Sequence, residues 1–329
     1  MEKQSRIFVA GHRGLVGSAL VRRLRAQGFN NLLLRTHAEL ELTDTAAVQH
    51  FFESEKPEYV LLAAARVGGI LANNTYPADF IRFNLAIQSS VIEASYQARV
   101  KRLLFLGSSC IYPRLALQPI KESSLMTGLL EPTNRPYALA KIAGIEMCWA
   151  FNRQYGTKYV AAMPTNLYGP GDNYDLEKSH VLPALIRKVY EAKLAGRKEL
   201  PVWGSGTPLR EFLYSDDMAD ACIFLLMLKP EIYDALLRED EAPLVNVGAN
   251  SELTIRELAE LVKRVLEFDG EIIFDPSKPD GTPRKLMDSS RINALGWHAT
   301  TPLEVGIRKT YEDALPRLRE YARLAGLPV

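Results

Sequence analysis

The sequence predicts an α/β fold, a doubly wound parallel sheet with a smaller C-terminal lobe interleaved with it. Short apolar runs without polar alternation, typical of strands buried on both faces, recur along the chain. Segments with helical periodicity separate these runs, and such connections place helices on both faces of a sheet. No linker or low-complexity tract divides the chain, so the smaller lobe is expected to be interleaved. We expect strands at residues 7–10, 32–34, 59–65, 103–106, 159–162 and 245–248. Among the helices between and after them, one is expected to begin at Asn84 and another at Thr254.

Composition argues against several classes of protein. The 329 residues include 40 Lys plus Arg and 39 Asp plus Glu, a formal charge of +1 that argues against a nucleic-acid-binding or membrane-surface protein. Three cysteines without paired spacing do not make a disulfide framework and favour a reducing compartment. The N-terminus lacks the apolar core of a signal peptide, and stretches such as 222–228 are too short to span a bilayer. We expect a cytoplasmic protein without a metal.

A glycine-rich turn follows the first predicted strand. Glycines let a backbone approach a pyrophosphate closely, and a helix N-terminus offers free N–H groups and positive potential. The alternative is an ordinary tight turn that needs positive φ. Strand, turn and helix in this order favour a dinucleotide site. The turn consists of Gly11, His12, Arg13, Gly14, Leu15, Val16 and Gly17, and residues 18–24 after it have helical periodicity.

The end of the second predicted strand indicates which dinucleotide is preferred. An NAD-binding protein places an acidic residue there to hold the ribose hydroxyls, whereas this strand ends at Arg35. Arg35, Arg13 and His37 would instead meet a 2′-phosphate, which favours NADP; solvated surface arginines are the alternative. Asp44 either reaches the adenine edge or caps a helix predicted at 45–52.

Further residues at the carboxyl edge of the sheet are expected to line the cofactor site. Ligands of doubly wound sheets bind beyond the carboxyl ends of the strands. The small residues Ala63 and Ala64 leave room there for a flat cofactor. The next strand end contributes Leu106, Gly107 and Ser108 to the same edge.

A Tyr-x-x-x-Lys pair, Tyr137 and Lys141, opens an apolar helical run. Residues four apart share one face of a helix, so the phenol and the ammonium are expected to lie close together. The cation would lower the pKa of the phenol and make Tyr137 a proton donor near neutral pH. With the hydroxyl of Ser108, the pair suits carbonyl reduction by a cofactor hydride. Such pairs are also common on ordinary helices, and strand-end hydroxyls are often only turn formers.

Cys110 and His180 form a second candidate pair. In an extended segment Cys110 shares a face with Ser108, and its thiol suits a base if positive charge lowers its pKa. His180 precedes a helical pattern, where a lone histidine is usually a cap or a surface group. If the two residues face each other across a cleft, they are an acid and a base on opposite sides of a substrate. Cys148 and Cys222 lie in apolar helical runs and are expected to fill the core.

Several long segments are distinctive, and they carry a resemblance over nearly the whole chain. The chain resembles the extended short-chain dehydrogenase/reductases, and among them the enzymes that epimerise GDP-4-keto-6-deoxy-D-mannose at C3 and C5 and reduce it at C4. The glycine turn and the Tyr-x-x-x-Lys pair specify only the superfamily, whereas Ser-Ser-Cys at 108–110 with Ser-His-Val at 179–181 points to this group. The segments are 11–14, 67–69, 73–77, 107–113, 131–133, 164–170, 179–181 and 203–212.

The resemblance implies a reaction and the residues that perform it. Ser108, Tyr137 and Lys141 match the family's reduction triad, while Cys110 and His180 match the pair that moves protons during epimerisation. The implied reaction consumes NADPH and yields GDP-L-fucose. Another nucleotide-sugar 4-epimerase or 4-ketoreductase of this fold is the first alternative, and a non-catalytic NADP-sensing protein is the second.

The resemblance also implies where the ligands bind. His37 stands where the family often has an arginine on the 2′-phosphate, which weakens the expected preference for NADP over NAD. The family is usually dimeric, so a homodimer is implied. We expect an NADP-binding Rossmann domain at 1–165 plus 213–248 and a substrate lobe at 166–212 plus 249–329. Further cofactor contacts are expected from Pro164, Thr165, Asn166, Leu167 and His180, and substrate contacts from Ser108, Cys110, Asn166, His180, Lys188, Trp203, Arg210, Asp280 and Lys285.

The substrate contacts in the second half have different expected roles. Trp203 offers a face for packing and Arg210 a fork for the diphosphate, while Lys188 is a further phosphate candidate. Asp280 would reach the nucleotide base or ribose, and Lys285 would lie near phosphate. The alternatives are solvated cations for Lys188 and Arg210, and a charged surface turn for the loop that carries Asp280.

Overall fold

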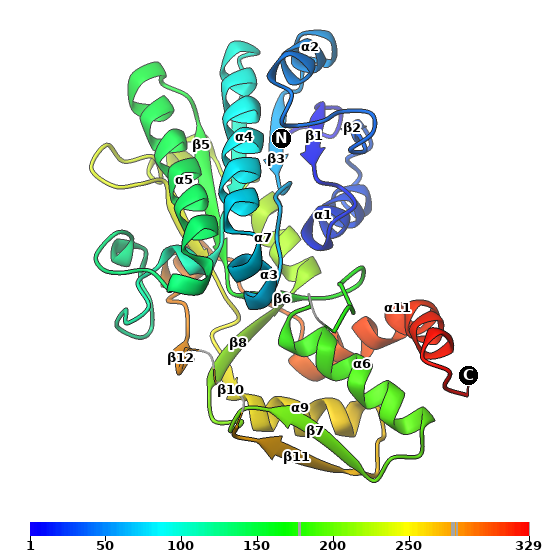
Figure 1. The fold of residues 1–329 in the computed structure, drawn as a ribbon. Helices are drawn as coiled ribbons and strands as arrows, with labels where there is room; N and C mark the ends of the chain where they lie inside the picture. Colours follow the sequence, from blue (N-terminus) through cyan, green and yellow to red (C-terminus); the bar gives the residue numbers. More distant parts are fainter. Residues whose placement is uncertain (177–178, 278–279, 281, 329) are drawn as a thin grey trace.

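Six parallel strands form the central sheet (Figure 1). The structure is a computed structural model that describes all residues except 177–178, 278–279, 281 and 329. The strands are β1 (Ile7–Ala10), β2 (Leu32–Leu33), β3 (Tyr59–Leu62), β4 (Arg102–Leu106), β5 (Tyr159–Pro164) and β9 (Leu244–Val247). Their order is β2-β1-β3-β4-β5-β9, so the direction of winding reverses between β1 and β3. In such sheets ligands bind in the crevice at the carboxyl ends of the strands where this reversal occurs.

Each face of the sheet packs against its own helices. Successive residues of a strand point to opposite faces, so Ile7 and Val9 enter one hydrophobic core while Phe8 and Ala10 enter the other. The two layers of helices cover nearly continuous apolar strands, as expected for a parallel sheet. The first core includes residues of α1 (Leu15–Ala26) and α7 (Ser215–Met227); the second includes residues of α2 (Thr45–Glu55), α4 (Pro77–Gln97) and α5 (Arg135–Tyr155).

A smaller lobe lies below the sheet in Figure 1 and has a hydrophobic core of its own. Strand β8 (Leu209–Tyr214) is central to it, because β6 (Asn166–Tyr168), β10 (Glu252–Thr254) and β12 (Arg284–Lys285) all pair with β8. The rest of the lobe includes β7 (Glu199–Trp203), β11 (Glu271–Asp275), α6 (Val181–Leu194), α9 (Ile255–Val265) and α11 (Leu303–Leu324). Short helices elsewhere are α3 (Ile70–Thr75), α8 (Pro230–Asp234) and α10 (Ser290–Ala294).

The predicted fold class is confirmed, and the strand predictions differ from the structure only at their ends. One helix was misplaced: the predicted start at Asn84 is wrong, because α4 begins at Pro77, whose missing N–H suits a first turn. The helix predicted from Thr254 has a capping box, in which Thr254 and Glu257 satisfy each other's backbone N–H groups. The proposed division into two domains stays a prediction. Among the described residues, no helix is long and apolar enough to cross a membrane.

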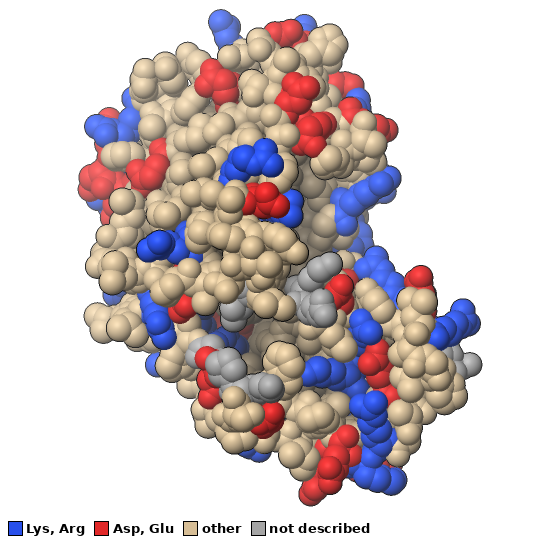
Figure 2. All heavy atoms as spheres, viewed as in Figure 1, with Lys and Arg blue, Asp and Glu red and all other residues tan. Residues whose placement is uncertain are grey.

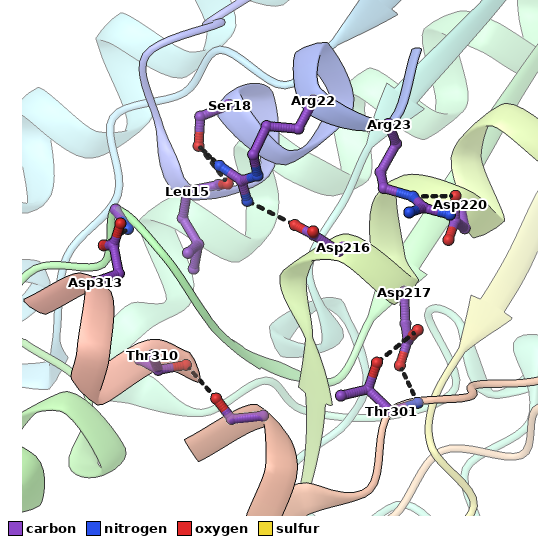
Figure 3. A network of polar contacts seen from close by, with 12 residues as sticks. Leu15, Ser18, Arg22, Arg23, Asp216, Asp217, Asp220, Thr301, Thr310 and Asp313 are labelled. Carbon is purple, nitrogen blue, oxygen red and sulfur yellow. Dashed lines mark hydrogen bonds and ion pairs between the residues drawn. The ribbon is translucent and has the colours of Figure 1, made fainter. Parts of the chain in front are cut away.

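A polar network joins α1 to α7 and α7 to the chain before α11 (Figure 3). Arg22 pairs with Asp216 at 2.6 Å, and both side chains are partly exposed. Asp217 is buried and accepts hydrogen bonds from the Thr301 N–H at 2.9 Å and the Thr301 hydroxyl at 3.1 Å. A third hydrogen bond comes from the Thr300 hydroxyl at 3.0 Å. Asp217 therefore holds the segment that leads into α11 against α7.

Replacing Asp217 with alanine is expected to lower the free energy of unfolding by about 2–3 kcal/mol, because a buried N–H and two hydroxyls lose a charged acceptor. Urea denaturation measures this change. The matched control is Arg22→Ala, which removes a partly exposed ion pair worth about 1 kcal/mol or less. Equal losses for the two variants would contradict the structural role of Asp217.

Candidate active site

The expected site residues gather at the carboxyl edge of the sheet. The glycine turn follows β1, Ala63 and Ala64 follow β3, and Gly107 follows β4. Strand β6 then carries the chain into the smaller lobe. The molecular surface is hollowed between the two lobes on the face that Figure 2 shows. This is the position at which doubly wound sheets bind their ligands.

Two glycines of the turn, Gly11 and Gly17, are packed too closely against the backbone to carry side chains. Gly11 has a φ of +83°, and a Cβ there would lie 2.7 Å from the Ala64 backbone nitrogen. A Cβ on Gly17 would lie 2.0 Å from the Gly11 carbonyl oxygen. Two strands and the start of α1 therefore meet without intervening side chains. The resulting bare backbone can approach a pyrophosphate.

The N-terminus of α1 has the features of a phosphate site. Gly14 is the N-cap residue, and no side chain caps the first turn. The first N–H groups of α1 are therefore free of side-chain partners, and the helix dipole favours an anion beside them. In the same turn the His12 Nδ1 atom is buried without a hydrogen-bond partner. The glycine cradle and this unpartnered nitrogen fit the diphosphate of a dinucleotide.

Arg35 and His37, two of the three residues predicted to meet a 2′-phosphate, have acidic partners in this structure. Arg35 pairs with Glu55 and lies over the Phe51 ring, its guanidinium carbon 5.2 Å from the centroid. His37 Nε2 lies 2.6 Å from a Glu41 oxygen. These contacts leave the phosphate role of Arg35, Arg13 and His37 a prediction.

Asp44 serves as a helix cap, which confirms one of the two readings of this residue. Its carboxylate accepts the Ala47 N–H at 3.0 Å as the N-cap of α2. An oxygen at this position satisfies one of the otherwise unpaired donors of the first helical turn. Contact between Asp44 and adenine remains untested.

Ser108, Cys110 and Tyr137 lie together beyond β4. Ser108 directly precedes a single 3₁₀ turn at Ser109–Ile111, and its hydroxyl accepts the Cys110 N–H at 3.5 Å. The Ser108 hydroxyl also lowers the pKa of the Tyr137 phenol and of the Cys110 thiol, so it acts on both groups. Phe80 packs edge-on against Tyr137, with ring centroids 6.1 Å apart. One hydroxyl therefore links the predicted reduction and epimerisation groups.

Lys141 is buried, and its ammonium donates to the Leu106 carbonyl oxygen at 2.7 Å. The nitrogen lies 5.9 Å from the centroid of the Tyr137 ring. Burial lowers the pKa of Lys141 to about 8, and the nearby Cys110 acts in the opposite direction.

The expected lowering of the Tyr137 pKa is wrong for this structure. Burial raises the pKa of the phenol, the Cys110 thiol adds to this, and the hydrogen bond with Ser108 only opposes it. The physical reason is that the ammonium of Lys141 is directed to a backbone carbonyl, so it does not offset the loss of water around the phenol.

Cys110, His180 and Lys285 form a cluster of titratable groups that interact across the two lobes. Burial raises the pKa of the Cys110 thiol; the ammonium of Lys285, the hydrogen bond with Ser108 and the ammonium of Lys141 lower it. His180 directly precedes α6 and does not cap that helix with its side chain. His180 is exposed as a residue, and burial of the imidazole by the surrounding protein, followed by the charge of Lys285, lowers its pKa. Lys285 therefore acts electrostatically on both members of the candidate pair.

The remaining substrate candidates lie on the smaller lobe. Lys188 stands over the exposed face of Trp203, its ammonium 5.3 Å from the ring centroid. Burial lowers the pKa of Arg210, and Asp280 raises it. Asp280 accepts hydrogen bonds from the Ser205 N–H at 3.0 Å and the Ser205 hydroxyl at 2.7 Å. Asp280 thus fastens a turn in this structure, and its contact with a nucleotide base remains a prediction.

The sequence interpretation missed the roles of two acidic residues near this cluster. Glu131 accepts the Thr133 N–H and hydroxyl, pairs with Arg114 at 3.3 Å and raises the pKa of Lys285. Glu211 is completely buried within β8. A charged residue inside an apolar strand was the available signal for Glu211, whereas Glu131 lies in a surface-like turn that gives no such signal.

The fold and the arrangement of these side chains define an extended short-chain dehydrogenase/reductase. Residues 7–235 match the NAD dependent epimerase/dehydratase family, and the chain belongs to this family. Within it, the chain belongs with the GDP-L-fucose synthases, as its similarity to named members shows.

Three known proteins illustrate this similarity. The chain is 60% identical to GDP-L-fucose synthase 1 of Arabidopsis thaliana over 311 residues, which cover 94% of this chain and 93% of that protein. It is 54% identical to GDP-L-fucose synthase of Escherichia coli K12 over 315 residues, with coverages of 95% and 97%. A crystal structure of a GDP-L-fucose synthetase from Naegleria fowleri bound to NADP superposes with a TM-score of 0.84 at 26% identity, covering 97% of this chain and 96% of that one.

Proposed function

We propose that this protein is a bifunctional NADPH-dependent 3,5-epimerase-4-reductase that converts GDP-4-keto-6-deoxy-D-mannose to GDP-L-fucose. The observation that carries the proposal is that one hydroxyl links the two groups: Ser108 accepts the Cys110 N–H at 3.5 Å and lowers the pKa of both the Cys110 thiol and the Tyr137 phenol. Through this link, a thiol suited to proton abstraction and a phenol suited to proton donation share one site. The similarity to GDP-L-fucose synthases supports the choice of substrate.

Epimerisation uses the 4-keto group to acidify the neighbouring C–H bonds. Cys110, as the thiolate, takes the proton from C3 or C5, and the ketone becomes an enolate whose C4 oxygen accepts hydrogen bonds from Ser108 and Tyr137. His180, on the adjoining lobe, returns a proton to the opposite face of the carbon. Lys285 stabilises the thiolate by its charge. The same groups act at each carbon in turn.

Reduction at C4 ends this exchange. NADPH, when bound, supplies the hydride. Tyr137 donates its proton to the oxygen of C4, and Ser108 holds that oxygen in place. The raised pKa of Tyr137 keeps the phenol protonated at neutral pH, so its proton is present when the alkoxide forms. Lys141 donates a hydrogen bond to the Leu106 carbonyl oxygen and so holds α5, which carries Tyr137, against the end of β4.

The carboxyl edge of the sheet would hold NADPH. The glycine turn and α1 would bind its diphosphate, and Arg35, Arg13 and His37 would bind its 2′-phosphate. The unpaired His12 nitrogen and the bare glycine backbone support this assignment. The other proposed contacts are Asp44, Ala63, Ala64, Leu106, Gly107, Pro164, Thr165, Asn166, Leu167 and His180.

Replacing Arg35 with alanine is expected to weaken NADPH binding about tenfold or more while changing NADH binding much less, because only NADPH carries the 2′-phosphate. Titration of cofactor fluorescence measures both dissociation constants without turnover. Glu55→Gln is the matched control, since it frees Arg35 from its ion pair but keeps the cation. Unchanged selectivity in Arg35→Ala would assign the phosphate to another residue.

The substrate would lie between the lobes. Arg210 and Lys188 would face its diphosphate, Trp203 would pack against it, and Asp280 would reach the nucleoside. We further propose a homodimer, as the family resemblance implies, and a cytoplasmic location. The location is supported by the requirement for Cys110 as a free thiol, which a reducing compartment maintains.

Incubation of the pure protein with GDP-4-keto-6-deoxy-D-mannose and NADPH in D₂O tests the proposal. NMR of the product should show GDP-L-fucose with deuterium at C3 and C5. A 6-deoxy sugar reduced at C4 but unlabelled at C3 and C5 would identify a simple 4-ketoreductase. NADPH binding without consumption of the ketone would indicate a protein that binds the cofactor but does not turn over.

A further inference from the structure

Glu211 is a fully buried carboxylate whose hydrogen-bond partners are mostly backbone N–H groups. Its Oε1 accepts the Asn250 N–H at 2.8 Å, and its Oε2 accepts the Met287 N–H at 3.1 Å. Burial raises the pKa of this carboxyl, and the hydrogen bonds from the backbone of Met287 and Asn250 lower it. A buried charge is costly unless hydrogen bonds satisfy it, so these contacts fix the carboxylate firmly.

The surroundings of Glu211 leave little freedom. A Cβ on Gly248 would lie 2.4 Å from the Glu211 Oε1 atom, so the absence of a side chain there makes room for the carboxylate. The Glu211 carbonyl oxygen accepts the Asn166 amide at 2.8 Å and the Thr165 hydroxyl at 3.2 Å. Glu211 thus joins the chain as it leaves the central sheet, the loop after β9 and the segment after β12.

The segment that carries Lys285 is held on both of its edges. On one edge β12 pairs with β8, with Lys285 opposite Arg210. On the other edge, Ile120 donates its N–H to the Leu286 carbonyl oxygen at 2.8 Å. The Glu211 carboxylate fixes the Met287 N–H, two residues beyond Lys285. Glu211 therefore sets how far along β8 this short strand lies.

The position of Lys285 matters because its ammonium stands among the charged groups of the site. Its charge acts on Cys110 from β12 and on His180 from across the lobes. Arg210 and Glu131 are the other charged groups that act on Lys285 itself. Lys141 and Tyr137, both on α5, are the remaining groups coupled to the thiol. A shift of β12 would change the electrostatics of Cys110 and His180 together.

We propose that Glu211 is a positioning residue for the epimerisation half of the reaction, which holds β12 so that the Lys285 ammonium stays beside Cys110 and His180. This inference rests on the proposed function. In this inference Lys285 acts on Cys110 and His180, the two residues that move protons. The sequence alone predicts instead that Lys285 lies near the diphosphate of the substrate.

Displacement of Lys285 should change the pKa of Cys110 and the pKa of His180 in the same direction. With Lys285 displaced, burial of Cys110 is less compensated, so the pKa of the thiol rises and less thiolate forms at a given pH. The pKa of His180 rises as well, because the neighbouring positive charge is removed. Proton exchange should therefore slow at neutral pH, and the rising limb of its pH profile should move to higher pH.

Exchange of deuterium into GDP-4-keto-6-deoxy-D-mannose, with NADP⁺ present so that no reduction occurs, measures epimerisation alone. Glu211→Gln keeps the size of the side chain but replaces one of its two acceptor oxygens with an N–H₂ donor. One of the two backbone N–H groups therefore loses its acceptor. We expect at least a tenfold loss of exchange, with the rising limb displaced to higher pH. Reduction of the already epimerised ketone should fall much less. Lys285→Gln should displace the limb in the same direction.

Glu122→Gln is the matched control, because Glu122 also accepts a backbone N–H, but that of Asn246 on β9 at 2.9 Å rather than that of Met287. It should exchange deuterium like the unchanged enzyme. Wild-type exchange and an unmoved pH profile in Glu211→Gln would overturn the inference, as would equal losses of exchange and reduction. Glu211→Asp, which retracts the carboxylate but keeps its charge, provides the same test if the glutamine variant does not fold. Absence of exchange in the unchanged enzyme would instead overturn the proposed function.

Discussion

Cys110→Ser is expected to slow deuterium exchange at C3 and C5 by about 10²–10⁴-fold, because a serine hydroxyl is a far weaker acid than a thiol and forms no useful anion beside Lys285. Reduction of the already epimerised ketone should remain, since Ser108, Tyr137 and Lys141 are untouched. Mass spectrometry of the recovered substrate measures exchange, and absorbance of NADPH measures reduction. Equal loss of both activities would remove Cys110 from the role of base.

The matched control for this variant is Cys148→Ala. Cys148 is fully buried in α5, as predicted for a core cysteine, and burial raises its pKa. Its replacement removes a second internal thiol without touching the Ser108 hydroxyl. Exchange and reduction should both stay near their original rates, so a loss seen only in Cys110→Ser reports on the site itself.

Tyr137→Phe is expected to reduce the rate of NADPH oxidation by about 10²–10⁴-fold, because the phenol that protonates the C4 oxygen is lost. Exchange should remain measurable, since Ser108 still donates to the ketone oxygen and Cys110 still removes the proton. The fall should appear in kcat at saturating substrate. An unaltered rate of NADPH oxidation would defeat the assignment of Tyr137 as proton donor.

Tyr112→Phe controls for the loss of a buried phenol hydroxyl. Tyr112 donates to the Asn246 amide oxygen at 2.6 Å and lies outside the proposed reaction groups. Its replacement should lower the melting temperature without a comparable loss of reduction. A similar fall in both tyrosine variants would mean that packing around α5, not proton donation, controls the rate.

Much of the fold could be predicted because its signals are local. The apolar run at 7–10, the glycine turn after it and the capping residue Thr254 each depend on neighbours in sequence. Strand β12 could not be predicted, since two charged residues have no periodicity and pair only because β8 and Ile120 flank them. The start of α4 was missed because Asn84 is polar but internal, and its amide bonds the Arg66 backbone.

The sequence predicted that several of these side chains lie close together, but it did not predict their electrostatics. The spacing of Tyr137 and Lys141 shows that they share a helix face, yet only the structure shows the ammonium directed to Leu106. The contact of Lys285 with a phosphate stays a prediction, but the action of its charge on Cys110 and His180 was not foreseen from the sequence. These facts depend on segments that meet only after folding, and no local pattern contains them.

During synthesis of the chain, the small sheet around β8 can be completed only after the central sheet. Its strands come from residues 166–168, 209–214, 252–254 and 284–285, so their pairing depends on contacts far apart in sequence. The last strand of the central sheet, at 244–247, leaves the ribosome before β12 does. A nascent chain can therefore complete the nucleotide-binding sheet while the thiol of Cys110 still lacks its neighbouring cation. The groups proposed for epimerisation therefore come together only after residues 284–285 have been synthesised.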